Sequence, residues 1–382
     1  MVYLFWISGF FIFFSLIGYP IFLKIVNKYV KKDLIKVDGN YEPTVSIIIP
    51  AHNEEQVIEK KLDNLMNLLY EKIKIEIIIA SDNSTDDTNK IVRNYIKQNE
   101  VVNIKLFEVV QRMGKTNAQN EAVKISKGEI LIFSDANSLL DSKAIKEIVS
   151  YFYDDSISYV TGKLVYTNSD VAESSESESN YWDYDLAMRK IESDIGSVTA
   201  GNGALYGVRK SDYINLDPVQ CHDSIFPQKM VLKNKKAKYN ERALAYEKAG
   251  EVSEDEFKRK VRMSRQILSI SFSDINKYNI LKYKWFSFFY FSHRFLRNNL
   301  YLLHIIFYFS NLMIIENSRM YLYMFLLQTV FFLLACIGIK IKLKITYIPF
   351  YYSMTITAQL VGAKNELTGK SKPFWEKAET TR

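Results

Sequence analysis

Four short apolar runs, each separated from the next by a helical stretch, constrain the fold of this chain most strongly. The runs are VSIII (45–49), KIEIIIA (74–80), NIKLFEV (103–109) and EILIF (129–133), and the helical stretches begin near Glu55, Asp86, Lys115 and Asp141. Strands this apolar, alternating with helices, predict a parallel sheet that is covered on both faces. The fold class predicted from this pattern is α/β.

The chain beyond this region continues the soluble part, and we expect a Rossmann-like domain over residues 40–270. A Ser/Glu-rich stretch (168–180) is typical of an exposed loop or a helix start, and the segment 181–192 is predicted to be helical. GNGALYGVRK (201–210) predicts a turn that runs into a strand, and CHDSIFPQKMVLK (221–233) predicts a helix. A basic amphipathic helix follows, and Ser253 with Glu256 forms a capping-box pattern at its start.

The N-terminal segment is apolar enough to be a membrane anchor. Residues 1–23 carry no charge, and Lys24, Lys28, Lys31 and Lys32 follow them. A helix of this length crosses about 30 Å of hydrocarbon. The segment lacks the leading basic residues and the small-residue cleavage site of a signal peptide, so we interpret residues 1–26 as a retained anchor. The lysines predict that the next domain lies in the cytoplasm.

The C-terminal third is again apolar and aromatic. Residues 271–299 mix aromatic side chains with His293, Arg294 and Arg297, which is typical of an amphipathic helix in the lipid headgroup layer. About three spans are predicted within residues 300–365, and residues 366–382 form a tail. The third segment crosses the bilayer or re-enters it, and the tail lies outside or inside accordingly. Both readings give a multi-pass protein of the plasma membrane.

Charge and cysteine content exclude several other classes of function. The net charge is +7, but the lysines cluster beside the apolar segments, which favours anionic lipid headgroups over nucleic acid as the partner. Cys221 and Cys336 are the two cysteines, so the sequence holds no disulfide framework. The four histidines are scattered and do not form a zinc motif.

Polar side chains follow three of the predicted strands. The segments are PAHNEE (50–55), SDNSTDD (81–87) and the pair Asp135 and Asn137. Ligands of open α/β sheets bind outside the carboxyl ends of the strands, so we expect these residues to meet in one crevice. Each has a plainer alternative: SDNSTDD can cap a helix, and Asp135 can end a strand. Several acids in one place, however, require a cation or hydrogen-bond donors.

In order along the chain, PAHNEE, SDNSTDDT, QRMGK with Asn120, and SDAN resemble the successive motifs of family 2 glycosyltransferases. The likeness runs from Val45 to at least Arg262, and the flanking apolar segments resemble the membrane-bound synthase branch. The resemblance implies a GT-A fold and an inverting transfer from a nucleotide sugar, usually a UDP-sugar.

The resemblance also implies a donor site. Asp82 and Glu54 would accept hydrogen bonds from the uracil and ribose, with Pro50 beside them. Lys115 would meet the diphosphate; alternatively it is a solvated surface lysine. Asp135 and Asn137 occupy the DxD position, where Mg²⁺ or Mn²⁺ bridges to the donor diphosphate. Asn137 brings no charge, so metal affinity without nucleotide should be weaker than for two acids.

An inverting transfer needs a base that takes the proton of the acceptor hydroxyl. Asp223 matches the acid that the family places before a downstream helix, and His222 is its rival. Asp212 and Asp217 have contexts typical of a cap and a turn. Gly201, Asn202 and Gly203 would by resemblance line the acceptor side, although a simple β-turn is the alternative.

Residues 259–263 align with the QxxRW motif of the polymer-making branch. Arg262 is kept and would bind diphosphate, or it belongs to a basic helix face that lies on anionic lipid. Arg259 and Met263 replace the glutamine and the tryptophan, and the loss of the indole puts long processive extension in doubt.

These features predict a metal-dependent inverting glycosyltransferase that uses a glycan or lipid-linked acceptor in surface polysaccharide synthesis. One alternative is a processive synthase that translocates its product; its channel would require a second copy or an accessory subunit. The other alternative is a nucleotide-sugar-binding component without turnover.

Overall fold

The structure is a computed structural model that describes residues 1–99, 102–168, 173–249, 253–341 and 343–374. The chain forms two compact units. The sheet unit contains Val26–Ser253, Asn279–Ser287 and the chain from Lys372 onward. The helical unit contains Met1–Ile25, Glu254–Tyr278 and Phe288–Ser371.

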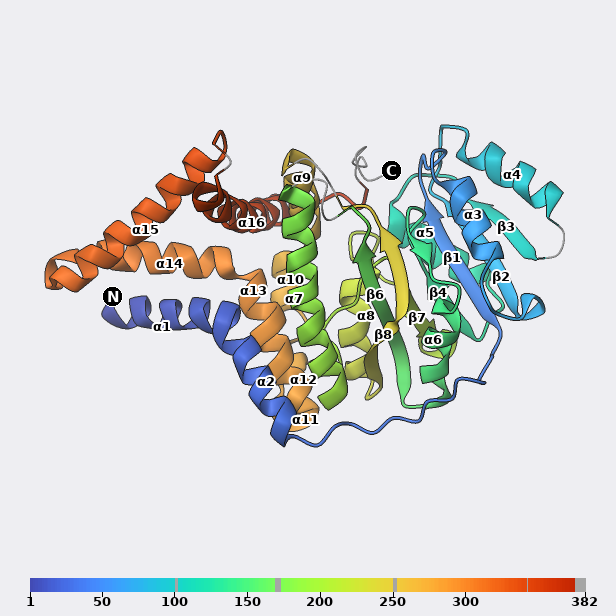
Figure 1. Cartoon of the computed structure of the whole chain (residues 1–382), viewed down its shortest axis with the longest axis horizontal. Helices are drawn as coiled ribbons and strands as arrows, with labels where there is room; N and C mark the ends of the chain where they lie inside the picture. The colour runs from blue at the N-terminus through green and yellow to red at the C-terminus, as the bar shows by residue number, and fades with distance from the viewer. Residues whose placement is uncertain (100–101, 169–172, 250–252, 342, 375–382) are drawn as a thin grey trace. The chain divides into compact units, whose positions relative to one another are not determined.

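The sheet unit is built on an eight-stranded sheet with the order β3-β2-β1-β4-β7-β6-β8-β5 (Figure 1). Its strands are β1 (Val45–Ala51), β2 (Ile75–Ser81), β3 (Asn103–Glu108), β4 (Ile130–Phe133), β5 (Leu139–Leu140), β6 (Ile157–Tyr166), β7 (Tyr206–Arg209) and β8 (Lys236–Glu247). The four predicted strands, β1 to β4, are present and parallel. The sheet as a whole is mixed, because β7 runs antiparallel to β4 and β6, and β5 runs antiparallel to β8.

The helices of the sheet unit follow the predicted alternation. They are α3 (Ile58–Met66), α4 (Thr88–Gln98), α5 (Lys115–Ile125), α6 (Ala144–Ser150), α7 (Glu173–Ile195), α8 (His222–Leu232) and α11 (Ile280–Tyr283), with short 3₁₀ turns at Lys72–Lys74, Tyr151–Tyr153 and Lys210–Asp212. The first four begin within three residues of their predicted starts. Part of the Ser/Glu-rich stretch belongs to α7, and residues 169–172 lie outside the described chain.

Helices cover both faces of the sheet, as the apolar strands predict. Neighbouring residues of a strand point to opposite faces. Phe133 stacks on Tyr206 and meets the ring of His222 from α8. On the other face, a Cβ at Gly207 would lie 2.8 Å from Ile148 of α6. The glycine therefore lets α6 pack closely on β7.

The helical unit begins with a continuous helix, Val2–Tyr29, whose residues up to Ile25 belong to this unit; it is made of α1 (Val2–Phe13), a π-turn (Phe14–Gly18) and α2 (Tyr19–Tyr29). Its other elements are α9 (Ser253–Met263), α10 (Ile267–Phe272), Ile275–Tyr278 (3₁₀), α12 (Trp285–Phe289), Tyr290–Phe295 (π), α13 (Leu296–Asn298), α14 (Leu300–Leu312), Ile315–Asn317 (3₁₀), α15 (Arg319–Gly338) and α16 (Lys344–Leu367). α1 packs along α14, where Phe5 stacks on Phe307 with ring centroids 4.7 Å apart. Gln359 ties α16 to this group by donating to the carbonyl of Arg297 at 2.8 Å.

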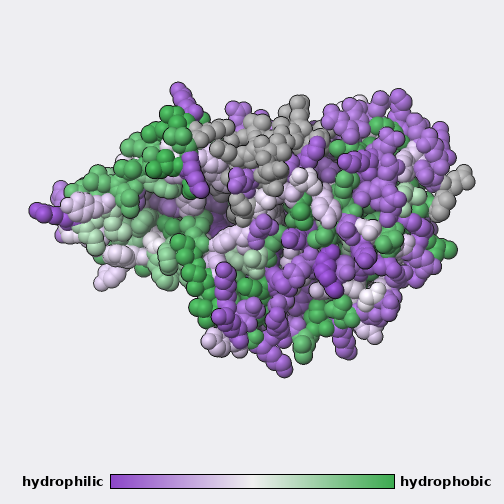
Figure 2. Space-filling model, in the orientation of Figure 1, coloured by the Kyte–Doolittle hydropathy of each residue, from purple (hydrophilic) through white to green (hydrophobic). Residues whose placement is uncertain are grey.

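Two helices of the described chain are long and apolar enough to cross a membrane: Val2–Tyr29 and Arg319–Gly338. Hydrophobic side chains are exposed along α15, as Figure 2 shows, with Leu327 71% exposed. α14 has 13 residues, or about 20 Å of helix, which is shorter than the hydrocarbon core. α16 interrupts its apolar residues with polar ones such as Gln359. One C-terminal span thus meets the criteria, and the other two stay predictions.

Candidate active site

The loops that follow β1 and β2 are joined by hydrogen bonds at the carboxyl edge of the sheet. The amide of Thr85 donates to Asn53 Oδ1 at 2.8 Å, and the amide of Glu54 donates to Thr88 Oγ1 at 2.7 Å. Asn53 has a φ of 55°, which an asparagine tolerates better than most residues. Asp86 serves the start of α4 by accepting from the amide of Thr88 at 3.0 Å. The capping role therefore falls to Asp86, and Asp82 is left for another task.

Asp82 holds the loop that precedes α5. Its side chain is 3% exposed, and its two carboxylate oxygens accept from the amides of Met113 and Gly114 at 3.0 and 2.8 Å. Gly114 has a φ of 93°, a conformation that favours glycine. This contact places Lys115, the first residue of α5, at the end of β2. Glu54 is also buried, and Pro50 is the penultimate residue of β1.

Pro50 helps to separate β4 from β1 where the site begins. The carbonyl of Ile48 accepts from the amide of Ser134 at 3.3 Å, so Pro50, two residues on, faces the same side. A proline has no N–H to continue the ladder. The segment after Phe133 therefore leaves the sheet, and Asp135 and Asn137 are partly exposed while Ala136 between them is buried.

Lys115 and Asp135 form an ion pair at the centre of this edge. Burial lowers the pKa of Lys115, but the nearby carboxylates of Asp135 and Asp223 outweigh it, and the net pKa lies above the ordinary value. A Cβ at Gly203 would lie 2.8 Å from Lys115 Nζ and 2.9 Å from Asp135 Oδ2. The glycine thus lets the Lys115 and Asp135 side chains approach the backbone of the turn closely, and any larger residue would displace one of them.

The oxygen donors of Asp135 and Asn137 fit a hard divalent cation. Asp135 offers a carboxylate and Asn137 an amide oxygen, which are ligand types that Mg²⁺ and Mn²⁺ accept. Within the described residues, no three His, Cys, Asp or Glu side chains form a metal cluster. Mg²⁺ is commonly bound through one or two protein oxygens, with substrate phosphates and water completing the coordination, so Asp135 and Asn137 could hold such an ion together with a substrate.

Asp223 lies in the first turn of α8 and is connected to the turn that contains Gly201, Asn202 and Gly203. The amide of Gly201 donates to the carbonyl of Asp223 at 2.8 Å. Asn202 is 2% exposed, and its side chain donates to the carbonyl of Gly162 at 2.7 Å. The Asn202 side chain thus maintains the turn, while Gly203 is the member that faces Lys115 and Asp135.

The sequence reasoning missed Arg189, which fixes this turn from α7. Its guanidinium donates to the carbonyl of Gly201 at 2.5 Å and pairs with Asp185 at 2.5 Å. Both side chains are buried, although an Asp–Arg pair four residues apart is usually found on an exposed helix face. The sequence did place Arg189 in the same predicted helix as Trp182, and in the structure the Trp182 ring lies against its guanidinium.

His222, the rival base, is enclosed in an aromatic cluster. It is 2% exposed and contacts the rings of Phe133, Tyr206, Tyr213 and Phe226. Its ring nitrogens lie 3.1 Å from the hydroxyl of Tyr206 and 3.4 Å from that of Tyr213. Burial, with a contribution from Lys115, lowers the pKa of His222 to about 3. A neutral, enclosed imidazole is a poor candidate for accepting a proton from a substrate.

The buried His222 predicts acid sensitivity of the fold. Its pKa is lower in the folded protein than in the unfolded chain, so the stability it contributes is present above pH 6.5 and is lost as the pH falls toward 3. Between pH 7 and pH 5 we expect a loss of about 2 kcal/mol in the free energy of unfolding. Thermal unfolding at several pH values should show that His222→Phe weakens this dependence, whereas His52→Asn retains it. Equal slopes in wild type and His222→Phe would contradict the prediction.

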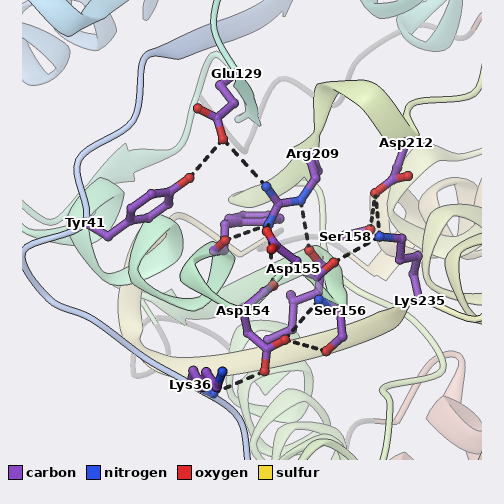
Figure 3. A network of polar contacts seen from close by, with 12 residues as sticks. Lys36, Tyr41, Glu129, Asp154, Asp155, Ser156, Ser158, Arg209, Asp212 and Lys235 are labelled. Carbon is purple, nitrogen blue, oxygen red and sulfur yellow. Dashed lines mark hydrogen bonds and ion pairs between the residues drawn. The ribbon is translucent and has the colours of Figure 1, made fainter.

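The other two acids lie in local structural contacts. Asp217 accepts from the amide of Val219 at 2.9 Å, as a turn residue does. Asp212 belongs to the polar network of Figure 3, where it accepts from Ser158 and lies 3.9 Å from Lys235 Nζ. In the same network Arg209 pairs in register with Ile130, the first residue of β4. The network therefore lies at the opposite end of β4 from Asp135.

Arg262 lies on α9 in the helical unit. The sheet unit thus brings together Lys115, Asp135, Gly203 and Asp223, with Asp82 holding the loop in front of Lys115. The roles of these residues in binding and catalysis stay predictions.

Residues 46–213 match the model of the family described as glycosyl transferase family 2. This segment of the chain therefore carries the glycosyl transferase family 2 match, and the mixed sheet forms a GT-A-like domain. A poly(ribitol-phosphate) beta-glucosyltransferase of Bacillus spizizenii is 30% identical over 192 residues, which cover 50% of this chain and 30% of the relative. A probable glycosyltransferase of Bacillus subtilis, YdaM, is 33% identical over 129 residues, covering 33% of this chain and 31% of the relative.

A beta-monoglucosyldiacylglycerol synthase of Nostoc is 30% identical over 140 residues, covering 37% of this chain and 28% of the relative. The matches span about a third of the length of these curated relatives. Among solved structures, the mannosyltransferase PcManGT from Pyrobaculum calidifontis, in complex with GDP-Man and Mn²⁺, superposes with a TM-score of 0.72. The superposition covers 96% of this chain and 99% of that one at 19% identity, and it establishes the likeness of the fold.

Proposed function

We propose that this protein is a membrane-bound, metal-dependent glycosyltransferase that moves a hexosyl or N-acetylhexosaminyl group from a UDP-sugar, with inversion, to a glycan or lipid-linked acceptor in surface polysaccharide synthesis. One observation carries the proposal: Lys115 and Asp135 are paired beside Gly203, with Asp223 close enough to raise the pKa of Lys115. This transfer requires a cation that binds phosphate, a carboxylate that binds the metal and a carboxylate that accepts a proton. Lys115, Asp135 and Asp223 would supply these three groups in that order.

The donor would lie along the carboxyl edge of the sheet. Pro50, Glu54 and Asp82 would line the nucleoside side, and Lys115 would meet the diphosphate. The carboxylate of Asp82 is engaged by two loop amides, so it would bind uracil at its remaining acceptor positions or after the loop has shifted. Asp135 and Asn137 would hold Mg²⁺ or Mn²⁺, which neutralises charge on the leaving diphosphate when bound.

The acceptor would approach on the side of Gly201, Asn202 and Gly203. Asp223 would take the proton of the attacking hydroxyl, and its position depends on the bond from the Gly201 amide to its carbonyl. The anchor (1–26), the interfacial segment (271–299) and the C-terminal segments (300–365) would attach this domain (40–270) to the cytoplasmic face of the plasma membrane. The exposed apolar side chains of α15 support a lipid partner.

The test is a donor panel with the full chain in detergent or nanodiscs. UDP-glucose, UDP-galactose, UDP-N-acetylglucosamine and GDP-mannose are supplied with Mn²⁺, with Mg²⁺ or with EDTA, and nucleotide release is measured. We expect one UDP-sugar to release UDP with either metal and the EDTA reactions to remain at background. Binding of the donor without release would defeat the enzyme and favour a binding component. Release that is unchanged in EDTA would defeat the metal requirement.

A further inference from the structure

Lys61 is a fully buried lysine on α3, beneath the loop that carries Asp135 and Asn137. Its exposed fraction is 0%. Burying an ammonium ion is costly unless its N–H groups are bonded and nearby charges oppose it. The contacts that stabilise Lys61 therefore indicate where its charge acts.

The loop 134–138, which carries Asp135 and Asn137, is called the metal loop. The Lys61 ammonium donates hydrogen bonds to both of its ends. Its Nζ donates to Ser134 Oγ at 2.8 Å and to the carbonyl of Ser138. These two residues flank the segment from Asp135 to Asn137 on either side. The loop is closed a second time by the amide of Ser138, which donates to the carbonyl of Asp135 at 3.2 Å.

The two serines extend this contact to both sides of the site. Ser134 Oγ donates to the carbonyl of Ala204 at 2.6 Å, in the residue after Gly203. Ser138 Oγ donates to the carboxylate of Glu247, the last residue of β8. One cation thus connects the metal loop, the glycine turn and β8.

The neighbouring turn of α3 holds the same segment. Asn64 donates to the carbonyl of Leu140 at 2.9 Å and accepts from its amide at 2.8 Å. Residues three apart share one helix face, so Lys61 and Asn64 together fix residues 134–140. Of the two, Lys61 alone brings a charge.

The electrostatics agree with this arrangement. Burial lowers the pKa of Lys61 to about 7, and the carboxylates of Asp135 and Glu247 oppose that shift. Lys61 therefore interacts with Asp135 through space as well as through the backbone of the loop.

We infer that Lys61 is a positioning residue that fixes the direction of Asp135 and Asn137 and so determines the affinity of the site for its divalent cation. The inference rests on the proposed function, because that function places the metal there. Residues that orient metal ligands typically contribute about 10–100-fold to metal affinity.

The experiment compares wild type with Lys61→Met in the full chain. Mn²⁺ binding in the presence of UDP is measured from the free Mn²⁺ signal in electron paramagnetic resonance, and the Mn²⁺ dependence of UDP release is measured in parallel. We expect Lys61→Met to require at least ~10-fold more Mn²⁺ for half-saturation in both.

Lys238→Met is the matched control. Lys238 is 1% exposed in the same unit, and its Nζ donates to the carbonyls of Ser193 and Gly196 and to Asp33. This variant should lose stability but keep the wild-type Mn²⁺ dependence. Ser134→Ala covers the case in which Lys61→Met does not fold. It removes one of the two bonds from Lys61 to the loop, the one at Ser134 Oγ, and it should raise the Mn²⁺ requirement in the same direction.

Wild-type Mn²⁺ affinity in folded Lys61→Met would overturn the inference, as would wild-type affinity in Ser134→Ala if Lys61→Met does not fold. An equal loss of affinity in Lys238→Met would also overturn it, because the effect would then be one of stability. If wild type binds Mn²⁺ with UDP but releases no UDP from any donor, the proposed function fails while the binding comparison still decides the role of Lys61. If wild type binds no Mn²⁺, both fail.

Discussion

Asp223→Asn is expected to release UDP at least ~100-fold more slowly than wild type while binding donor and metal equally well. The substitution keeps the size of the side chain but removes its ability to accept a proton from the acceptor hydroxyl. The bond that positions residue 223 uses its backbone carbonyl, which accepts from Gly201, so the change of side chain leaves that contact in place. The loss should therefore fall on turnover and leave the donor KM close to the wild-type value.

The measurement is UDP release at saturating donor and metal, with Asp217→Asn as the control. Asp217 is a neighbouring acid of the same type whose carboxylate serves a turn. Asp217→Asn should keep wild-type turnover. If Asp223→Asn also turns over at the wild-type rate, Asp223 is not the base. Because His222 is enclosed, the base would then be another group of the sheet unit.

Much of the site followed from the sequence because parallel strands deliver their carboxyl ends to one edge. Once the apolar runs 45–49, 74–80 and 129–133 are parallel neighbours, the polar residues that follow them must share that edge. The position of Lys115 beside Asp135 depended in addition on the bonds from the Met113 and Gly114 amides to Asp82. Helix α5 begins at Lys115, as the sequence pattern predicted.

The rest depended on packing that no local pattern reports. α3 has lysines at positions 60 and 61, and only the structure distinguishes the exposed Lys60 from the buried Lys61. Asn202 has a polar side chain of the kind that contacts an acceptor sugar, yet its side-chain amide donates to the carbonyl of Gly162 in β6. The pairing of β6 with β8 contains register shifts. Polar residues interrupt the apolar alternation of both strands, so the sequence pattern did not predict them as strands.

Asp135→Ala is expected to lose most of the donor binding that depends on metal, by at least ~100-fold in affinity. A direct ligand should matter at least as much as the outer contacts that contribute about 10–100-fold. Asn137 does not compensate for the loss, since its amide oxygen can ligate the cation but lacks the negative charge of a carboxylate. The substitution also frees Lys115 from its ion pair, so its ammonium becomes available to the diphosphate. Binding of UDP in EDTA should therefore be retained or slightly stronger.

Titration of UDP in Mn²⁺ and in EDTA separates these two effects. Wild type should bind more tightly in Mn²⁺ than in EDTA, and Asp135→Ala should bind equally in both. Asp141→Ala is the matched control, because Asp141 follows the same segment and accepts from the amide of Lys143 at 2.9 Å. It should keep the wild-type difference. If Asp135→Ala shows the wild-type difference in UDP affinity between Mn²⁺ and EDTA, the metal does not bind at the edge of β4. A loss of binding in EDTA as well would mean that Asp135 acts mainly by orienting Lys115.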